Sequence, residues 1–266
     1  MYPARADSKY LPSQVTQLLQ VISYLDELLE IEDFQDYGPN GLQVPGADEL
    51  SVVATGVSAH LELFEQASSL GAQLIVAHHG LFWDFHPRSI SPAMKRRLRV
   101  LFDNDISLAG YHLPLDAHPE VGNNALICSA LGLERAEPFG EHRGRSVGFV
   151  GRSAEGVPFA ELRSRCAAVF GQEPFVWETG PELVHSVGIV SGGAASSFRE
   201  AIALGFDAFL TGEPAEHVMA DARESRTHFI AAGHYATETL GVRRLGELLA
   251  ERFGLEHHFV EAPNPI

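Results

Sequence analysis

The sequence lacks the marks of several protein classes, and each absence narrows the fold. It holds only 2 cysteines in 266 residues, Cys128 and Cys166, with neither a C-x-x-C motif nor a similar spacing. We expect both to be reduced thiols in the core. No window approaches the roughly 18 uninterrupted apolar residues of a membrane span. The opening MYPARADSKYLP has no apolar run behind basic residues, which predicts a cytoplasmic protein without membrane attachment.

Positive charge is also scarce. The chain has 19 Lys and Arg against 35 Asp and Glu, a formal net charge of -16. Such a surface repels polyanions, so a nucleic-acid partner is not expected. A small anion such as a nucleotide is still compatible, because a bound metal reverses the local sign of the potential. There is no P-loop or G-x-G-x-x-G run, so no local motif marks a site for nucleotide phosphates.

The chain instead shows the alternation that is typical of α/β proteins. Its composition, 45% hydrophobic and 20% charged, is that of an ordinary globular protein. Apolar residues at helical spacing predict a first helix from Val15 to Ile31. Short β-branched runs then alternate with helical ones, among them SVVATGV, HLELFEQASSL, AQLIVAHH, PAMKRRLRVLF and ISLAGYH. The last helix is expected to run to about Leu249.

The same rhythm returns in the second half as an internal repeat. Residues 56–80 align with residues 189–213, and residues 105–116 align with residues 227–238. Similarity this short can arise by chance, but two matches in the same order favour a duplicated α/β unit. The second match places two H-x-x-x-[DE] motifs over each other at strand ends. Carboxyl ends of strands are where open α/β sheets bind ligands.

Each H-x-x-x-[DE] motif admits two interpretations. His234 and Glu238 are four apart where a helix begins, so both side chains can converge on one ligand. The alternative is a hydrogen bond on the helix surface. His112 and Asp116 admit the same two interpretations. Because Pro114 is expected to break any helix there, their convergence would have to come from a loop.

The run LIVAHHG ends a buried strand with two adjacent histidines. Neighbouring residues on a regular strand point to opposite faces. Both His78 and His79 can therefore serve one site only if the strand has ended and Gly80 lets the backbone turn. The alternative is one histidine in the core and one in solvent. Histidines and carboxylates at three strand ends, two of them related by the repeat, favour a shared site.

The donor types indicate which ions such a site prefers. Imidazole and carboxylate without thiolate suit zinc, iron, manganese or nickel. Five or six ligands exceed what one open catalytic ion needs. They fit two divalent ions that share a bridging carboxylate, at the roughly 3.5 to 4 Å separation of two-metal hydrolases.

Several separated motifs together resemble a known family. DYGPNGLQV, VAHHG, GYHLPLDAHPEVGNNA, FLTGE and AAGHYATE are similar, in this order, to the Nif-three-like dinuclear metal-centre family, whose bacterial members are GTP cyclohydrolase 1 type 2 homologues. The resemblance runs from the loop near Asp36 to the terminal PNPI. It implies metal ligands at His78, His79, Asp116, His234 and Glu238, with Glu238 bridging the two ions. It places His112 beside the site rather than on the metal.

The resemblance also implies an architecture and an assembly. The fold would be a duplicated α/β unit in two intertwined lobes, with the dinuclear site between them. Residues 1–134 with 234–266 would form the first lobe and residues 135–233 the second, without the inserted third domain of longer members. The family's toroidal hexamers imply a homohexamer, a trimer of dimers, with metal sites that face an internal cavity.

Two functions from different classes follow. The first is a metal-dependent hydrolase, in which a metal-bridging hydroxide attacks a small-molecule substrate such as the imidazole ring of GTP. His112 is then the candidate for proton transfer, beside Glu238 in the catalytic set. The alternative is a ring-shaped metal-binding scaffold or regulatory protein with little turnover.

Other polar residues receive plainer interpretations. Glu213 and His217 follow the second-half counterpart of the His78 strand. One interpretation places them in the lining of the pocket; the favoured one is a carboxylate that stabilises a helix N-terminus. Asn40 and Gly41 are expected only to form a turn. The remaining histidines are expected on the surface or in packing: His60, His86, His118, His142, His185, His228, His257 and His258.

Overall fold

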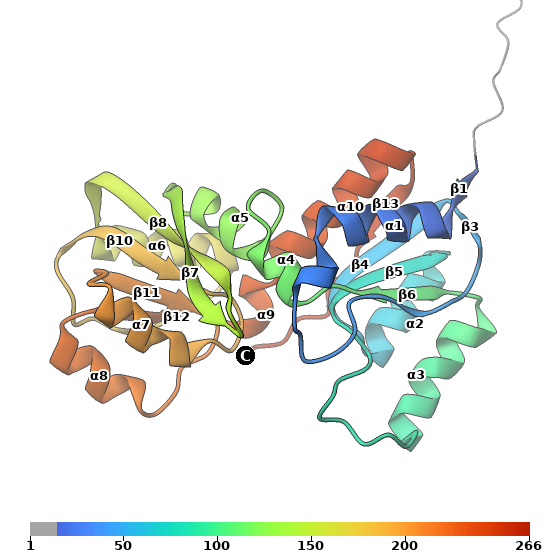
Figure 1. Ribbon diagram of the computed structural model, residues 1–266, viewed down its shortest axis with the longest axis horizontal. Helices are drawn as coiled ribbons and strands as arrows, with labels where there is room; N and C mark the ends of the chain where they lie inside the picture. Colours follow the sequence, from blue (N-terminus) through green and yellow to red (C-terminus); the bar gives the residue numbers. More distant parts are fainter. Residues whose placement is uncertain (1–14) are drawn as a thin grey trace, which may run out of the picture.

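The computed structural model describes residues 15–266, which fold into an α/β protein with two large β-sheets side by side (Figure 1). Residues 1–14, part of the first lobe in the sequence-based division, lie outside the described residues. The α/β class agrees with the alternation of strands and helices in the sequence. Among residues 15–266 no helix combines the length and apolarity needed to cross a membrane.

The first sheet has five strands in the order β13-β4-β5-β6-β2. Its strands are β2 (Gly41–Val44), β4 (Val52–Ser58), β5 (Leu74–His79), β6 (Ser107–Gly110) and β13 (Glu256–Phe259). β13, β4, β5 and β6 run parallel, and β2 closes the edge antiparallel to β6. A short ribbon of β1 (Thr16–Gln17) and β3 (Glu49–Leu50) stands apart.

The second sheet has six strands in the order β7-β8-β10-β11-β12-β9. Its strands are β7 (Glu134–His142), β8 (Arg145–Pro158), β9 (Phe175–Trp177), β10 (Leu183–Ile189), β11 (Ala208–Thr211) and β12 (His228–Ala231). β10, β11 and β12 are parallel neighbours, as β4, β5 and β6 are in the first sheet. The two parallel triplets are the segments that align in the sequence, so their carboxyl ends occupy equivalent places.

Helices cover both faces of each sheet (Figure 1). The longer helices are α1 (Leu18–Leu28), α2 (Leu61–Ser69), α3 (Pro92–Asp103), α5 (Asn123–Ala130), α6 (Phe159–Phe170), α8 (Val218–Ser225) and α10 (Thr239–Phe253). The shorter ones are α4 (Leu113–Ala117), α7 (Phe198–Ala203), α9 (His234–Thr237) and the 3-10 turns η1 (Ile31–Asp33) and η2 (Ala195–Ser197). α1 and α10 pack on one face of the first sheet, and α2 and α3 on the other.

The second sheet is covered in the same way, with α5 and α6 on one face and α7 and α8 on the other. Cys128 and Cys166 are buried, free thiols in the core beside α5 and α6, as expected from their spacing. Burial raises the pKa of both thiols to about 12. They are therefore packing residues. The packing of α5 also groups residues 123–130 with the second sheet, so the proposed lobe boundary at residue 134 falls after this helix.

The first helix is shorter than the predicted span from Val15 to Ile31. Thr16 and Gln17 pair with β3 instead, and the helix begins at Leu18. It ends at Leu28 because Glu30 adopts a left-handed conformation with φ of 50°. The apolar spacing therefore located the helix but not its ends, which depend on backbone pairing and on one residue's dihedral angles. The last helix continues four residues beyond the expected end, to Phe253.

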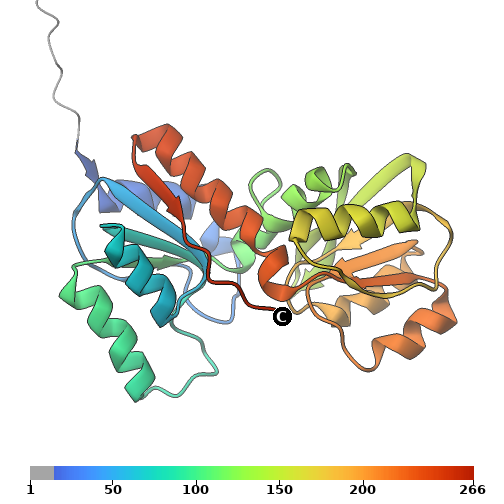
Figure 2. The same ribbon diagram turned by 180° about the vertical axis from the view of Figure 1, so that it is seen from behind.

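The chain leaves the second sheet at β12 and returns to the first through α9, α10 and β13 (Figure 2). Behind the molecule the segment after β13 runs back to the junction of the two sheets, where Tyr235 donates its backbone N–H to the Ile266 carbonyl at 2.9 Å. The carboxyl ends of β5, β6 and β12 meet at this junction. Three chain segments that are far apart in sequence therefore supply one site.

Candidate metal centre

His78 lies at the end of β5 with its ring fully buried. Its Nδ1 donates to the Tyr111 carbonyl at 3.0 Å, which leaves Nε2 unprotonated in the neutral ring. Nε2 lies 3.4 Å from Glu238 Oε1 and 3.6 Å from Asp116 Oδ2. Burial alone would lower the pKa of His78, but the two carboxylates outweigh it and raise this pKa to about 9. The buried Nε2 has no hydrogen-bond partner among the described residues.

His79 reaches the same site although β5 has not ended before it. Its ring centroid is 4.8 Å from that of His78, and its Nε2 lies 3.2 Å from Glu238 Oε2. Ser58 Oγ lies 3.1 Å from the other ring nitrogen, Nδ1. Burial lowers the pKa of His79, and the attraction of Glu238 offsets only part of this effect. The expectation that the strand must end before both histidines share a site was therefore wrong.

Gly80 follows the two histidines for a reason other than a turn of the backbone. Its φ is not in the left-handed region. A Cβ atom at this position would lie 2.2 Å from Gln43 Nε2. Gln43 accepts from the backbone N–H of Leu81 at 2.7 Å, so it holds the chain that leaves β5. The glycine thus permits a close approach of Gln43, which fixes where the strand delivers its histidines.

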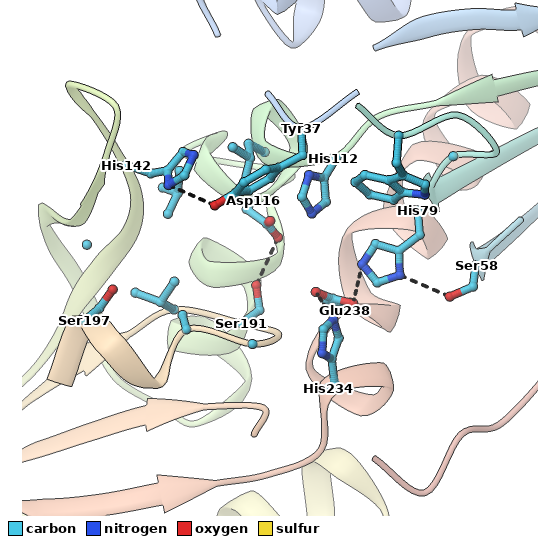
Figure 3. Close-up of a pocket in the computed structure, with 18 of the residues that line it drawn as sticks. Tyr37, Ser58, His79, His112, Asp116, His142, Ser191, Ser197, His234 and Glu238 are labelled. Atoms are coloured by element: carbon cyan, nitrogen blue, oxygen red, sulfur yellow. Dashed lines mark hydrogen bonds and ion pairs between the residues drawn. The ribbon is translucent and has the colours of Figure 1, made fainter. Parts of the chain in front are cut away.

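Glu238 stands at the centre of the site, between α9 and α10 (Figure 3). It is 2% exposed, and Oε1 lies 3.2 Å from His234 Nε2. Burial would raise the pKa of Glu238, but the histidines around it hold this pKa well below its ordinary value. Gly192 makes room for the carboxylate, because a Cβ there would lie 2.3 Å from Oε1. Glu238 is therefore an anion in contact with three imidazoles.

His234 is oriented by a second carboxylate. Its Nδ1 donates to Glu213 Oε1 at 2.5 Å, so Nε2 is turned toward Glu238. Burial would lower the pKa of His234, but Glu238 and Glu213 raise it to about 9. Glu213 lies five residues before α8 begins at Val218. Its interpretation as a helix-terminus charge was wrong, because its carboxylate holds a histidine of the site. His217, the residue before α8, makes no side-chain cap hydrogen bond.

Asp116 enters from α4, a one-turn helix that Pro114 does not prevent. Proline fits the first turn because its missing N–H would be unpaired there, so the expected loop was wrong. Oδ1 of Asp116 accepts from Ser191 Oγ at 3.0 Å and from Asn123 Nδ2 at 2.8 Å. These two donors leave Oδ2 to face His78 Nε2.

His112 lies beside the proposed ligands, and Asp36 and Asn40 fix its position through hydrogen bonds. Its Nδ1 donates to Asp36 Oδ1 at 2.7 Å, and its backbone N–H donates to Asn40 Oδ1 at 2.8 Å. Its ring centroid is 5.1 Å from that of His78 and 5.5 Å from that of His79. Burial would raise the pKa of Asp36, but His112 and Asn40 lower it to about 2. Asn40 therefore does more than form a turn.

The side chains fit a metal centre better than a hydrogen-bonded cluster. Imidazole nitrogens meet carboxylate oxygens at 3.2 to 3.6 Å. Ligands about 2.0 to 2.1 Å from a tetrahedral ion lie about 3.3 Å apart. Two buried atoms, His78 Nε2 and Glu238 Oε2, lack a hydrogen-bond partner among the described residues. Two groups have ligand atoms within 4.8 Å of one another: His78 with His79 and His112, and His79 with His234 and Glu238.

A pocket of about 570 Å³ opens over these residues. Figure 3 shows Tyr37 and His142 on one side of it, Ser197 below them and His79 across from them. Trp83 adds an aromatic wall, with its ring edge-on to His112 at 5.1 Å. Such a volume suits a small molecule rather than a polymer.

Sequence reasoning missed the residues that support the ligands. Asp36, Ser58 and Ser191 lie in loops or at strand ends without a histidine or carboxylate at fixed spacing, so no local pattern marks them. Of the histidines that were set aside, His142 and His60 line the pocket. His60 also accepts a backbone hydrogen bond at the start of α2. Of the others, His228 stacks on Phe159 and His258 pairs with Glu256 at the surface.

Comparison with known proteins finds relatives that match nearly the whole chain. The model of the Duf34/NIF3 (NGG1p interacting factor 3) family matches residues 16–265. A GTP cyclohydrolase 1 type 2 homolog of Pseudomonas aeruginosa is 40% identical over 248 residues, which cover 93% of this chain and 98% of that protein. A protein of the same name from Escherichia coli is 42% identical over 258 residues, with 94% and 98% covered.

Solved structures agree. One described as protein ybgI, of unknown function, superposes with a TM-score of 0.89 at 40% identity, covering 94% of this chain and all of that one. A protein from Thermus thermophilus gives a TM-score of 0.83 at 35% identity with the same coverage. The family model covers residues 16–265, and the two relatives are 40% and 42% identical over 98% of their length. The chain is a member of the Duf34/NIF3 family.

Proposed function

We propose that this protein is a dinuclear metal-dependent hydrolase that acts on a small molecule. One observation carries the proposal: the buried, ionised Glu238 lies 3.2 to 3.4 Å from the Nε2 atoms of His78, His79 and His234. A carboxylate with an imidazole at each oxygen is the arrangement that a bridging ligand requires.

The proposed ligands are His78, His79, Asp116, His234 and Glu238. Three imidazoles and two carboxylates suit zinc, iron, manganese or nickel. Four of the five are oriented by a partner on the other side: His78 by the Tyr111 carbonyl, His79 by Ser58, Asp116 by Ser191 with Asn123, and His234 by Glu213. The acceptors of the Nδ1 protons of His78 and His234 fix the ring orientation and raise the basicity of Nε2, whereas the donors to Asp116 fix its carboxylate.

When bound, two divalent ions would supply Lewis acidity, which lowers the pKa of water and polarises an electrophile. His112 would move the proton. Asp36 holds Nδ1 of this histidine, so Nε2 is the nitrogen that can accept a proton and release it to the leaving group. The ionised Asp36 stabilises the imidazolium formed in between. Trp83 and Tyr37, which line the pocket, limit the access of water from that side.

The substrate is proposed to be a small molecule, with a nucleotide as the first candidate. Relatives are named GTP cyclohydrolase 1 type 2 homologs, and a 570 Å³ pocket is of the size that holds a small ligand. A cyclohydrolase reaction would add water across the imidazole ring of GTP. No phosphate-binding loop favours GTP over other substrates, so the test uses several.

The experiment loads the purified protein with each metal, measures the ions per chain by elemental analysis, and incubates it with GTP and a panel of phosphoesters. We expect about two ions per chain and product from at least one substrate. Glu238→Gln should abolish release while the assembly remains intact. Full metal occupancy without turnover of any panel member would contradict the hydrolase and leave the scaffold interpretation.

A ring-shaped homohexamer, a trimer of dimers, is proposed on the family resemblance alone. Six chains of 28.9 kDa predict the mass of the assembly in solution. Light scattering on the full chain tests this directly. A monomer or dimer at micromolar concentration would contradict the hexamer without affecting the metal proposal.

A further inference from the structure

Positive charge in this acidic protein is concentrated next to the candidate metal centre. Residues 85–102, which form the loop after β5 and most of α3, contain five cations and no acidic residue. These are Arg88, Lys95, Arg96, Arg97 and Arg99. The whole chain has a net charge of -16, so the charge of this segment is opposite in sign to that of the protein as a whole.

Arg97 is the cation of this segment that lines the pocket over the proposed ligands. It is partly buried and makes no ion pair within residues 15–266. Arg99, by contrast, lies 3.9 Å from Asp103 on the exposed side of the helix. The helix itself is held by Met94, Leu98 and Leu101, which pack in the core beside α2. Arg97 is therefore presented to the pocket by a packed element and without an internal counterion.

The wall that belongs to the second sheet offers two hydroxyl groups. Ser196 and Ser197 line the same pocket, and neither side chain makes a hydrogen bond within the described residues. Figure 3 shows Ser197 on the side of the cavity away from His79. Hydroxyl groups donate readily to anionic oxygens. The two walls thus present an arginine and two hydroxyls that nothing in residues 15–266 uses.

We propose that Arg97, together with Ser196 and Ser197, binds an anionic group of the substrate at a subsite separate from the metal ligands. The substrate then carries two anionic ends, one at the metal centre and one, a phosphate or a carboxylate, at Arg97. Arginine suits this role because its planar fork donates two parallel hydrogen bonds to either group. The inference rests on the proposed function for the identity of the pocket.

The exposed cations of α3 add a long-range effect to this subsite. Lys95, Arg96 and Arg99 do not line the pocket, but their field attracts anions toward its mouth. This attraction should raise the association rate at low salt and fade at higher ionic strength. Arg97, in direct contact, should instead govern the dissociation rate.

The test compares two probes on the metal-loaded full chain: propane-1,3-diol monophosphate and propane-1,3-diol bisphosphate. Calorimetric titration should show the bisphosphate binding about ten- to a hundredfold more tightly, as a charge-assisted contact predicts. Arg97→Ala should reduce the affinity for the bisphosphate to that for the monophosphate. Arg97→Lys, which keeps the charge but loses the fork, should retain part of the preference.

Arg96→Ala is the matched control, because it removes the same side chain from the next position of the same helix but outside the pocket. It should leave the preference for the bisphosphate unchanged at 150 mM salt, a near-physiological strength at which the Debye length is about 8 Å. The proposal is overturned if Arg97→Ala keeps the full preference for the bisphosphate. It is also overturned if the unmodified protein binds neither this bisphosphate nor the longer hexane-1,6-diol bisphosphate more tightly than the corresponding monophosphate. Melting curves and metal content verify that each variant is folded.

Failure of this inference is distinguishable from failure of the proposed function. Binding of the probes needs no turnover, so an inactive but metal-loaded protein can still show the preference and its loss in Arg97→Ala. Conversely, an active hydrolase without the preference keeps its function and loses only the subsite. A matching pair of dicarboxylate and monocarboxylate probes decides whether phosphate or carboxylate is the favoured group.

Discussion

The carboxyl ends of β6 and β12 occupy equivalent places in the two sheets and carry equivalent residues, yet they contribute differently to the site. His112 after β6 and His234, the first residue of α9, each donate Nδ1 to a carboxylate, Asp36 in one case and Glu213 in the other. His234 Nε2 then lies 3.2 Å from Glu238. His112 makes no such contact with a carboxylate of the centre. The same orienting device thus serves a proposed ligand in one half and a proposed proton carrier in the other.

The neighbouring strand ends differ more. β5 delivers His78 and His79, whereas the aligned residues are Thr211, the last residue of β11, and Gly212 after it. Thr211 is used internally, donating to the Gly192 carbonyl at 3.0 Å. The serines at the carboxyl end of the first strand of each triplet remain equivalent. Ser58, the last residue of β4, holds His79 of its own half. Ser191 holds Asp116 of the other half.

The comparison shows that a symmetric frame supports an asymmetric site. The duplicated strands bring their ends to one junction, and substitution at those ends decides which half supplies imidazoles and which supplies the central carboxylate. The two members of an equivalent pair should therefore respond differently to the same substitution.

The largest effect is expected at the pair of carboxylates Asp116 and Glu238. Glu238→Gln should lower the metal affinity by more than the roughly 10- to 100-fold that loss of a supporting partner costs, because one ligand touches three histidines. Asp116→Asn should cost less, because it faces His78 alone. Elemental analysis after dialysis against chelator measures both. Equal losses would contradict the central position of Glu238.

The next largest effect is expected from the equivalent histidines His234 and His112, whose variants should differ in metal content. His234→Ala should lose metal, whereas His112→Ala should keep it and lose about 10²- to 10⁴-fold in turnover, the usual contribution of a general acid or base. Metal content and rate measured on the same samples check this. Should His112→Ala lose an ion, His112 belongs to the ligand set, as its place near His78 and His79 also allows.

Variants of the two orienting carboxylates, Glu213 and Asp36, should show weaker forms of the effects expected for the histidines that they hold. Glu213→Gln should weaken metal binding by about 10- to 100-fold. Asp36→Asn should leave metal binding within a few-fold and reduce turnover, because it acts on His112. A competitive chelator titration with a rate assay separates the two outcomes. Loss of metal in both variants would mean that both histidines are ligands.

Protons should leave when metal enters. In the metal-free protein the pKa of His78 and that of His234 are raised to about 9, so both rings are protonated at pH 7. A raised pKa gives stability that is complete below the unfolded value of 6.5 and is lost as the pH rises through 9. Metal binding replaces these protons. Calorimetry in buffers of different ionisation enthalpy should therefore detect proton release, and metal affinity should increase from pH 7 to 9.

The smallest effect is expected at the equivalent serines. Ser191→Ala removes a hydrogen bond to a buried carboxylate, worth about 1.5 to 3 kcal/mol, whereas Ser58→Ala removes one to a neutral ring, worth about 0.5 to 1.5 kcal/mol. Chemical denaturation of the metal-loaded protein measures both. A larger loss for Ser58→Ala would reverse the order and indicate that Ser58 fixes the His79 tautomer.

Local pattern was enough for much of the fold. The α/β class, the strand that ends at His79 and the helix from Pro92 all follow from residue spacing, because each depends on neighbours in the chain. The strand predicted in ISLAGYH also forms, but it ends at Gly110, two residues earlier than expected. Helix ends were less certain, as at Leu18 and Leu28, where strand pairing and one left-handed residue decide. The prediction that Pro114 excludes a helix was wrong because proline destabilises a helix only beyond its first turn, and the start of α4 could not be located from the sequence.

The sequence by itself determined the candidate ligands and the repeat that relates them, since imidazole and carboxylate at strand ends are chemical facts that need no coordinates. Only the tertiary structure decided how those groups are held and what surrounds them. Asp36, Ser191 and Glu213 lie 76, 75 and 21 residues from the side chains they orient. Arg97 reaches the pocket only because α3 packs beside it. Contacts between distant segments depend on how whole helices and strands pack, so the spacing of residues along the chain does not reveal them.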